Sequence, residues 1–204
     1  MTASGDPENI SSCSWVANDR LACRLGGYQE YNGEIYVFSN MIAINADGSG
    51  AKLLSKRRGS NALWVDLRGG GIIDYKPDAD GVVLMTRSYV PEEKIGSLIE
   101  AKHSGIGVDQ IDTRTLAVKR VETARPDAVE FISDGLGNVR IMGVAKKTPQ
   151  GYDSGNISYL YRPVGSGGWE TLGSLNYQSG EGFDPYAVDP QKNLAYGFLK
   201  LDGR

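Results

Sequence analysis

The chain has 204 residues, of which 40% are hydrophobic and 23% charged, and its formal net charge is −3. This composition provides for a globular core, and the weakly acidic balance argues against a nucleic-acid-binding domain, which needs a broad basic face. No apolar run approaches the roughly 20 residues of a membrane helix, and the polar residues 1–9 contain no signal-peptide core.

Residues 10–55 form the first predicted unit, which has four strands. The pattern predicts these strands over residues 10–16, 20–25, 34–45 and 52–54. Asp47-Gly48 lies between two apolar runs, which is a strong hairpin signal. Residues 26–33 are predicted to form a polar, aromatic loop. Three tyrosines in and beside this loop, Tyr28, Tyr31 and Tyr36, fit either packing at the rim of a sheet or a surface that faces a peptide.

The first predicted hairpin contains the only two cysteines, Cys13 and Cys23. They are symmetric about Asn18, as are Trp15 and Leu21, so each pair is predicted to face across the hairpin. The cysteines are either two small apolar core residues or a cross-strand disulfide, which would require an oxidising compartment. Trp15 and Leu21 are expected to be buried together between sheets. Two cysteines and a single histidine do not make a structural zinc site.

The same plan recurs three more times, over residues 60–122, 128–175 and 183–204. In the second unit, the predicted strands cover residues 72–75, 82–88, 106–112 and 116–122, with a sharp turn at 69–71 and a helical turn or loop at 91–99. In the third unit, they cover residues 129–133, 139–146, 156–163 and 169–172. Residues 183–200 provide two further strands, so the last unit is only half complete.

The recurrence of these units predicts the fold class. The second strand of each unit begins at Arg20, Val82, Val139 or Leu194, at steps of 62, 57 and 55 residues. Four strands at a near-constant step are typical of a β-propeller blade, and a blade buries its faces only against neighbouring blades. We therefore expect an all-β chain whose residues 1–204 form a propeller sector of about three and a half four-stranded blades. The alternative, a β-sandwich, would place strands about every 8–12 residues.

No self-sufficient catalytic site is predicted. A nucleophile elbow needs the pattern Gly-x-Ser-x-Gly, and Ser49 and Ser166 instead lie in Gly-Ser-Gly stretches typical of hairpin turns. His103 is the only histidine. Ser104 and Asp109 are its neighbours in sequence, but such neighbours rarely form a triad, so His103 is interpreted as a loop residue.

Charged clusters also receive structural interpretations. Asp78-Ala79-Asp80-Gly81 lacks the further oxygen ligands of a calcium loop and is interpreted as a hairpin turn. Glu92-Glu93 shows no paired arrangement of acids, and Lys56-Arg57-Arg58 is interpreted as a solvated loop. The sequence thus predicts no catalytic, cofactor-binding or metal-binding residue.

Several strings of the predicted units resemble the propeller domain of the prolyl oligopeptidase family, which includes dipeptidyl aminopeptidase-like serine peptidases. In the first two units these strings are Ser14-Trp15, Asp19-Arg20-Leu21, Ile44-Asn45-Ala46-Asp47-Gly48, Ile73-Asp74-Tyr75-Lys76-Pro77, Asp80 and Val83-Leu84. Later in the chain they are Asp134, Gly137-Asn138-Val139-Arg140, Tyr161-Arg162, Trp169-Glu170-Thr171-Leu172 and Leu201-Asp202-Gly203-Arg204.

The resemblance implies a seven-bladed propeller joined to an α/β-hydrolase domain that carries a Ser-Asp-His triad. It implies that this chain is a fragment of the accessory propeller, which restricts the access of peptide substrates to a hydrolase domain of the same parent protein. The compartment stays open between bacterial periplasm and cytoplasm. The alternative is a free-standing, non-catalytic interaction scaffold, and in either case open blade faces are expected to favour self-association.

Overall fold

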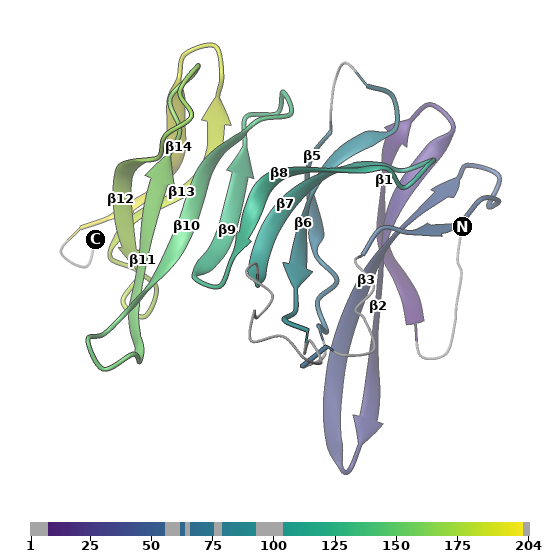
Figure 1. Ribbon diagram of the computed structural model, residues 1–204, viewed down its shortest axis with the longest axis horizontal. Coiled ribbons are helices and arrows are strands. Elements are labelled where there is room, and N and C mark those ends of the chain that lie inside the picture. Colours follow the sequence, from purple (N-terminus) through teal and green to yellow (C-terminus); the bar gives the residue numbers. More distant parts are fainter. Residues whose placement is uncertain (1–7, 56–61, 64–65, 76–78, 93–103, 202–204) are drawn as a thin grey trace. The chain divides into compact units, whose positions relative to one another are not determined.

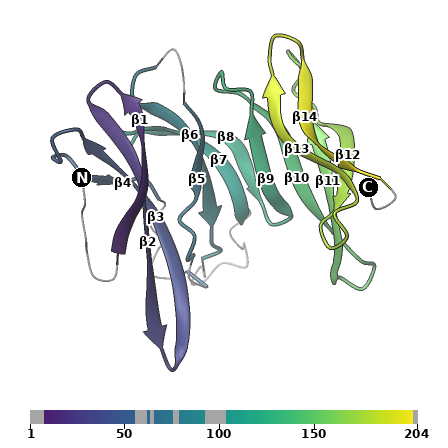
Figure 2. The same ribbon diagram turned by 180° about the vertical axis from the view of Figure 1, so that it is seen from behind.

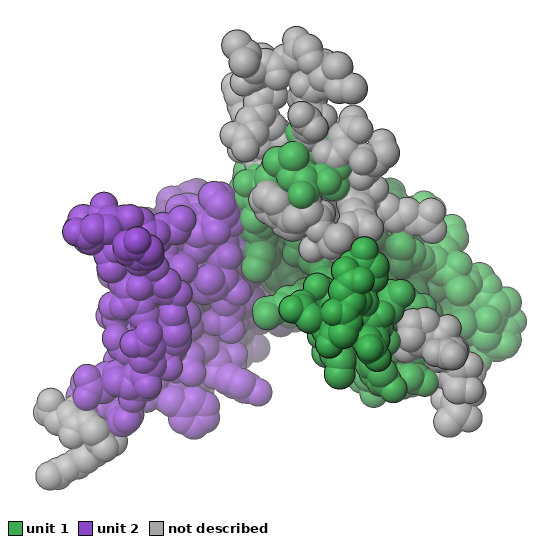
Figure 3. Space-filling view, turned by 90° about the horizontal axis from the view of Figure 1, so that it is seen from below, with its two compact units in different colours: residues 1–124 green, residues 125–204 purple. Residues whose placement is uncertain are grey.

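The structure is a computed structural model, and it describes residues 8–55, 62–63, 66–75, 79–92 and 104–201. The described residues form fourteen strands and no helix, so the predicted all-β class is confirmed. The chain divides into two compact units, residues 1–124 and 125–204 (Figure 3). This division falls between the second and third units that the sequence predicts.

The first sheet contains β1 (Glu8–Ala17), β2 (Arg20–Tyr31), β3 (Glu34–Asn45) and β4 (Lys52–Leu53). These strands are antiparallel and lie in chain order, β1-β2-β3-β4 (Figure 1). The predicted strand over residues 34–45 is confirmed at both of its ends. The predicted strand pairing within residues 10–25 is confirmed as well, with Trp15 opposite Leu21 and Cys13 opposite Cys23.

The loop predicted over residues 26–33 is wrong. Strands β2 and β3 remain paired up to Tyr31 and Glu34, and only Asn32 and Gly33 form the turn between them. Both turn residues have positive φ, 54° and 79°, which is the geometry of the two-residue hairpin turns that Asn-Gly favours. The polar and aromatic composition of this segment had masked a strong hairpin signal.

The second sheet contains β5 (Gly71–Tyr75), β6 (Val82–Tyr89), β7 (Gly105–Asp112) and β8 (Val118–Arg125), again in chain order. Each strand begins within two residues of its predicted start. Glu93 and most of the helical turn or loop predicted at residues 91–99 lie outside the described residues, as do Lys56-Arg57-Arg58, Asp78 and His103.

The first two sheets pack against each other through one apolar core. The buried residues of this core are Ala22, Met41, Ala43 and Leu54 from the first sheet and its end, and Val83, Met85 and Ile111 from the second. Alternate residues of β2 and β3 face this core, because successive side chains of a strand point to opposite faces. The opposite face of the first sheet therefore carries the residues between them.

Trp15 lies on that opposite face, and its predicted burial is wrong. The register opposite Leu21 is as predicted, but the Trp15 side chain is 60% exposed. Ala22, the neighbour of Leu21, faces the core, so Leu21 and Trp15 face away from it. The sequence shows which residues share a face, but it does not show which face another sheet covers.

Cys13 and Cys23 form a cross-strand disulfide on the same side of the hairpin as Trp15. Of the two interpretations that the sequence left open, the structure has the disulfide. Cys23 is buried and Cys13 is exposed, so the pair is not simply two small core residues.

The second compact unit is a single antiparallel sheet, seen from behind in Figure 2. Its strands are β9 (Ala128–Ser133), β10 (Val139–Lys147), β11 (Asp153–Tyr161), β12 (Glu170–Asn176), β13 (Gly182–Asp189) and β14 (Leu194–Lys200). Only Leu175 and Gly182 pair β12 with β13, and the sheet curls so that β13 also contacts β9. The predicted third and fourth units thus share one sheet, and the division into blades stays a prediction.

One buried hydroxyl joins strands of this curled sheet. Tyr159 is 1% exposed, and its hydroxyl lies 3.1 Å from Glu130 Oε2 and 3.4 Å from Asp184 Oδ1. Burial, with the charge of Glu130 next, raises the pKa of Tyr159. The phenol therefore remains a hydrogen-bond donor at neutral pH.

Candidate functional site

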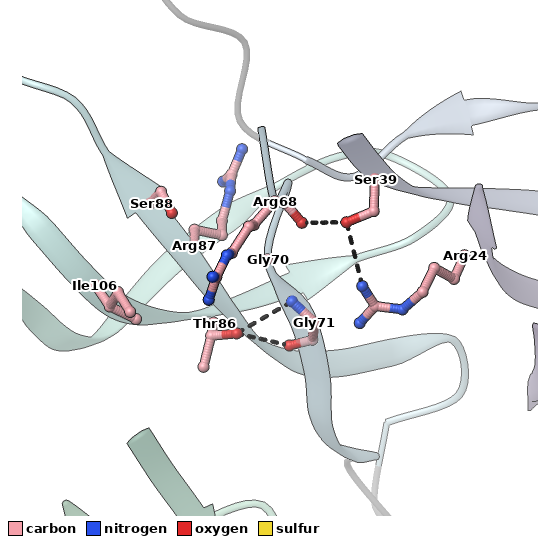
Figure 4. A pocket seen from close by; sticks show the side chains of 9 residues that line it. All are labelled: Arg24, Ser39, Arg68, Gly70, Gly71, Thr86, Arg87, Ser88 and Ile106. Atoms are coloured by element: carbon pink, nitrogen blue, oxygen red, sulfur yellow. Dashed lines mark hydrogen bonds between the residues drawn. The ribbon is translucent and has the colours of Figure 1, made fainter. Parts of the chain in front are cut away.

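A cavity of about 330 Å³ lies between the first two sheets, within the first compact unit (Figure 4). Its lining, called the arginine pocket below, consists of Arg24, Ser39, Arg68, Gly70, Gly71, Thr86, Arg87, Ser88 and Ile106. Three of these nine residues are arginines and none is acidic. The charged side chains of the described lining are therefore all cationic.

A glycine-rich linker brings the first and second sheets together at this pocket. Gly69 and Gly70 have φ values of 61° and 80°. A Cβ atom on Gly69 would lie 2.3 Å from the Ser39 carbonyl oxygen, and one on Gly70 would lie 2.0 Å from the Thr86 carbonyl oxygen. Only glycine permits both the positive φ and this close approach of backbones.

Hydrogen bonds fix the linker to both sheets. Ser39 Oγ donates to the Arg68 carbonyl at 2.6 Å and accepts from Arg24 Nη1 at 3.3 Å. On the other side, the Gly71 N–H donates to Thr86 Oγ1 at 3.1 Å, and the same hydroxyl donates to the Gly71 carbonyl at 3.1 Å. Figure 4 shows these contacts around the start of β5. Ser39 thus connects the Arg24 side chain of β2 to the Arg68 backbone of the linker.

The charges around the pocket are unequal. Arg87 Nη1 lies 3.3 Å from Asp109 Oδ2, and the Asp109 side chain is fully buried. The Tyr89 hydroxyl also donates to Asp109; burial, and then this contact, raises the pKa of Tyr89. Among the residues that the structure describes, no carboxylate lies within 4.0 Å of a guanidinium nitrogen of Arg24 or Arg68. The lining therefore carries an excess of positive charge.

Arg87, which belongs to the lining of the pocket, has one side-chain donor without an acceptor in the described part of the chain. Arg87 Nε is buried and makes no hydrogen bond there. A buried N–H without an acceptor costs about 1–3 kcal/mol. Asp109 Oδ1, in the carboxylate that pairs with Arg87, is likewise buried without a hydrogen bond in that part of the chain.

A second polar cluster joins the turns of the first two sheets. Arg20, only 2% exposed, donates from Nε and Nη2 to the Thr113 carbonyl at 3.1 and 2.6 Å. Its Nη1 donates to Asn45 Oδ1 at 2.5 Å and its Nη2 to the Gly50 carbonyl at 3.3 Å. Burial lowers the pKa of Arg20. Every direct acceptor of Arg20 is a neutral oxygen. The side chain therefore connects the turns through hydrogen bonds to neutral groups.

Neighbouring contacts strengthen the same junction. The Gly81 N–H donates to the Val16 carbonyl at 3.0 Å, across the two sheets. Arg114 Nη2 lies 2.5 Å from Asp19 Oδ1 and 3.3 Å from Asp80 Oδ2. The Arg114 contact holds the pKa of Asp19 below its usual range. These exposed ion pairs orient the turns and contribute little stability.

The residues weighed from the sequence do not converge on one site. Asp80 lies in the turn between the paired strands β5 and β6, in agreement with the hairpin interpretation, and it also pairs with Arg114. Asp109 is buried with Arg87, and its supposed neighbour His103 lies outside the described residues. Tyr28 and Tyr31 are 68% and 64% exposed on the β2–β3 hairpin. Rim packing therefore does not describe these two tyrosines.

Apart from the glycine turn at 69–71, no sequence pattern predicts the arginine pocket. Its three arginines come from β2, from the linker and from β6. Arg24 and Arg68 are more than 40 residues apart in the sequence, and Arg68 and Arg87 are 19 residues apart. No spacing rule connects residues on different sheets. A basic cluster in sequence, Lys56-Arg57-Arg58, lies outside the described residues.

The described residues contain no group of three or more His, Cys, Asp or Glu side chains suited to a metal ion. Within the same part of the chain, no helix is long and apolar enough to cross a membrane. Comparison of this chain with protein-family models, with curated proteins and with solved structures finds no match.

Proposed function

We propose that this chain is a non-catalytic section of a β-propeller that belongs to a prolyl oligopeptidase-like serine peptidase. One observation carries the proposal: two successive antiparallel sheets, each of four strands in chain order, pack face to face through a shared apolar core. Blades of a propeller are built and stacked in this way. The family is proposed from the sequence strings that resemble it.

A recurring arginine supports the equivalence of the units. Arg20 begins β2 and donates to Thr113, in a turn of the following sheet. Arg140 lies near the start of β10, where its Nε donates to the Arg162 carbonyl at 2.8 Å and its Nη2 to Asn193 Oδ1 at 2.6 Å. Asn193 lies in the β13–β14 turn of the predicted next unit. Corresponding arginines thus connect neighbouring units in both halves of the chain.

Open apolar surfaces support a larger propeller. Trp15 is exposed on the free face of the first sheet, and Tyr186, Phe198 and Leu199 are 79%, 73% and 60% exposed on β13 and β14. Tyr186 and Phe198 form an edge-to-face pair on that surface. Exposed apolar surface of this kind marks an interaction site, and in a propeller further blades would cover it.

In the proposed role, the chain performs no chemistry. It would form part of the wall around an active site on an α/β-hydrolase domain of the same parent, and it would limit the size of peptides that enter. Arg20, whose hydrogen bonds connect two sheets, would hold that wall together.

The coding sequence that follows Arg204 tests the proposal first. We expect it to encode further blades and a Gly-x-Ser-x-Gly nucleophile followed by an aspartate and a histidine. A reading frame without these features would refute the peptidase assignment. In a second test, the isolated chain is expected to hydrolyse no fluorogenic peptide or ester, and turnover that disappears when one of its serines is replaced would contradict the non-catalytic role.

A free-standing interaction scaffold is the second candidate. The observation in its favour is the β2–β3 hairpin, where Tyr28, Tyr31, Ile35 and Val37 are each at least 64% exposed. A scaffold would use such a hairpin to bind a partner protein. A reading frame that ends near Arg204, together with a stable self-associated state in analytical ultracentrifugation, would favour this function.

A further inference from the structure

We propose that the arginine pocket binds a small anionic molecule through a carboxylate or phosphate group. This inference does not depend on the peptidase assignment, because it rests on the described residues of the first compact unit alone. It assigns a ligand-binding role to a junction between sheets that would otherwise serve only packing.

The charge of the lining carries the first step. Three arginines line one cavity, and of these only Arg87 has a carboxylate partner, Asp109, in the described part of the chain; Arg68 is exposed to solvent. Arg120 Nε also lies 4.0 Å from Asp109 Oδ1, so this single carboxylate is shared between two arginines. Arg24 and Arg68 therefore remain uncompensated by any described acid. An anion in the pocket would neutralise this excess.

The kind of donor carries the second step. Guanidinium groups present N–H donors in a planar fork that matches two oxygens of a carboxylate or phosphate. Arg24 Nη1 already donates to the Ser39 hydroxyl at 3.3 Å within this lining. Ser88 lines the same cavity and adds a hydroxyl group. These groups suit an oxyanion better than a neutral or cationic molecule.

The size and construction of the cavity carry the third step. Its volume of about 330 Å³ lies at the lower end of the range of about 300–1,000 Å³ for small-molecule pockets. The two glycines keep the linker backbone close to both sheets, and the hydroxyls of Ser39 and Thr86 fix its position. The pocket is thus built by short-range contacts that do not depend on a ligand. The backbone of the pocket would therefore need little reordering on binding, which favours affinity.

Isothermal titration calorimetry of the whole chain tests the proposal, with sodium phosphate and sodium succinate as separate probes at matched ionic strength. We expect saturable binding of at least one probe, and weaker binding as sodium chloride is raised. Binding of phosphate alone would indicate a phosphorylated ligand, binding of succinate alone a carboxylate, and binding of both a general oxyanion site. If neither probe binds saturably at concentrations up to about 10 mM, any affinity is very weak, and the proposal is overturned.

Variants locate the binding within the molecule. Arg24→Gln and Arg68→Gln are each expected to weaken binding by about tenfold, the effect of losing one charge-assisted hydrogen bond. Arg125→Gln is the matched control, because Arg125 pairs with Asp127 and does not line the pocket. Equal weakening in the control would contradict the assignment.

A measurement on the unaltered protein covers the case in which these variants fold poorly. Arginine Nε–H resonances are recorded by nuclear magnetic resonance during the same titrations. Those of Arg24, Arg68 and Arg87 are expected to shift in a saturable way, while that of Arg125 stays in place. Uniform shifts of all arginines would indicate general ionic screening and would overturn the proposed site.

Discussion

Replacement of Arg20 by methionine tests how the first two sheets are held together. Methionine preserves much of the aliphatic volume and removes all the guanidinium donors. The Thr113 carbonyl, which accepts from Nε and Nη2, would lose both bonds, and the Thr113 side chain and backbone are fully buried. Asn45 Oδ1 and the Gly50 carbonyl would also lose their partner, but both residues lie nearer to solvent.

The expected loss of unfolding free energy follows from these acceptors. One buried acceptor without a partner costs about 1–3 kcal/mol, and the two nearer solvent add less than about 1 kcal/mol each. Removing a desolvated charge returns part of this cost, in agreement with the lowered pKa of Arg20. The net destabilisation is about 1–4 kcal/mol. Arg20→Lys is expected to lose a similar amount, because a single ammonium group does not reproduce the arginine fork.

Urea denaturation and hydrogen exchange measure the effect. The midpoint should fall for Arg20→Met, and the Gly81 amide, which donates to the Val16 carbonyl across the sheets, should exchange faster. Amides of β9–β14 should keep their protection. Arg125→Met serves as the control, with an expected change within about 0.5 kcal/mol, because this exposed arginine pairs only with Asp127 among the described residues. A loss below about 1 kcal/mol with unchanged exchange at Gly81 would refute the role given to Arg20.

Three further changes test other parts of the structure. Removing the disulfide in the Cys13→Ala/Cys23→Ala variant should lower stability by about 2–3 kcal/mol, the chain-entropy value for a loop of this length; equal urea midpoints for this variant and the oxidised parent would contradict it. Trp15→Ala should cost less than about 1 kcal/mol, because the side chain is 60% exposed, whereas a loss of several kcal/mol would show that another surface covers Trp15 in solution. Tyr159→Phe should cost about 1–3 kcal/mol, because two carboxylates lose their shared donor; a neutral result in thermal denaturation at pH 7 would mean that water replaces that donor.

Hairpins and strand registers were predictable because their signals are local. Cys13 faces Cys23, and the start of β3 at Glu34 is as expected, since alternation and turn residues act over a few positions. The same local rules also applied at Asn32-Gly33, where giving more weight to the Asn-Gly pair would have predicted the long hairpin correctly. The error there came from the polar composition of the segment.

Burial and the candidate pocket were not predictable in the same way. Trp15 has the residue type and the register of a core position, yet it lies on the face that no described sheet covers. Arg24, Arg68 and Arg87 carry no shared sequence pattern, because they meet only when two sheets and a linker pack together.

The sequence by itself determined the all-β class, most strand positions and the pairing that brings the two cysteines together. These properties depend on side-chain alternation, turn residues and strand propensity, which act within one hairpin. The tertiary structure alone decided which face of each sheet is buried, that Arg20 connects two sheets at Thr113, and that three arginines share one cavity. Such features arise from contacts between residues far apart in the chain, and the packing of one sheet on another sets those contacts.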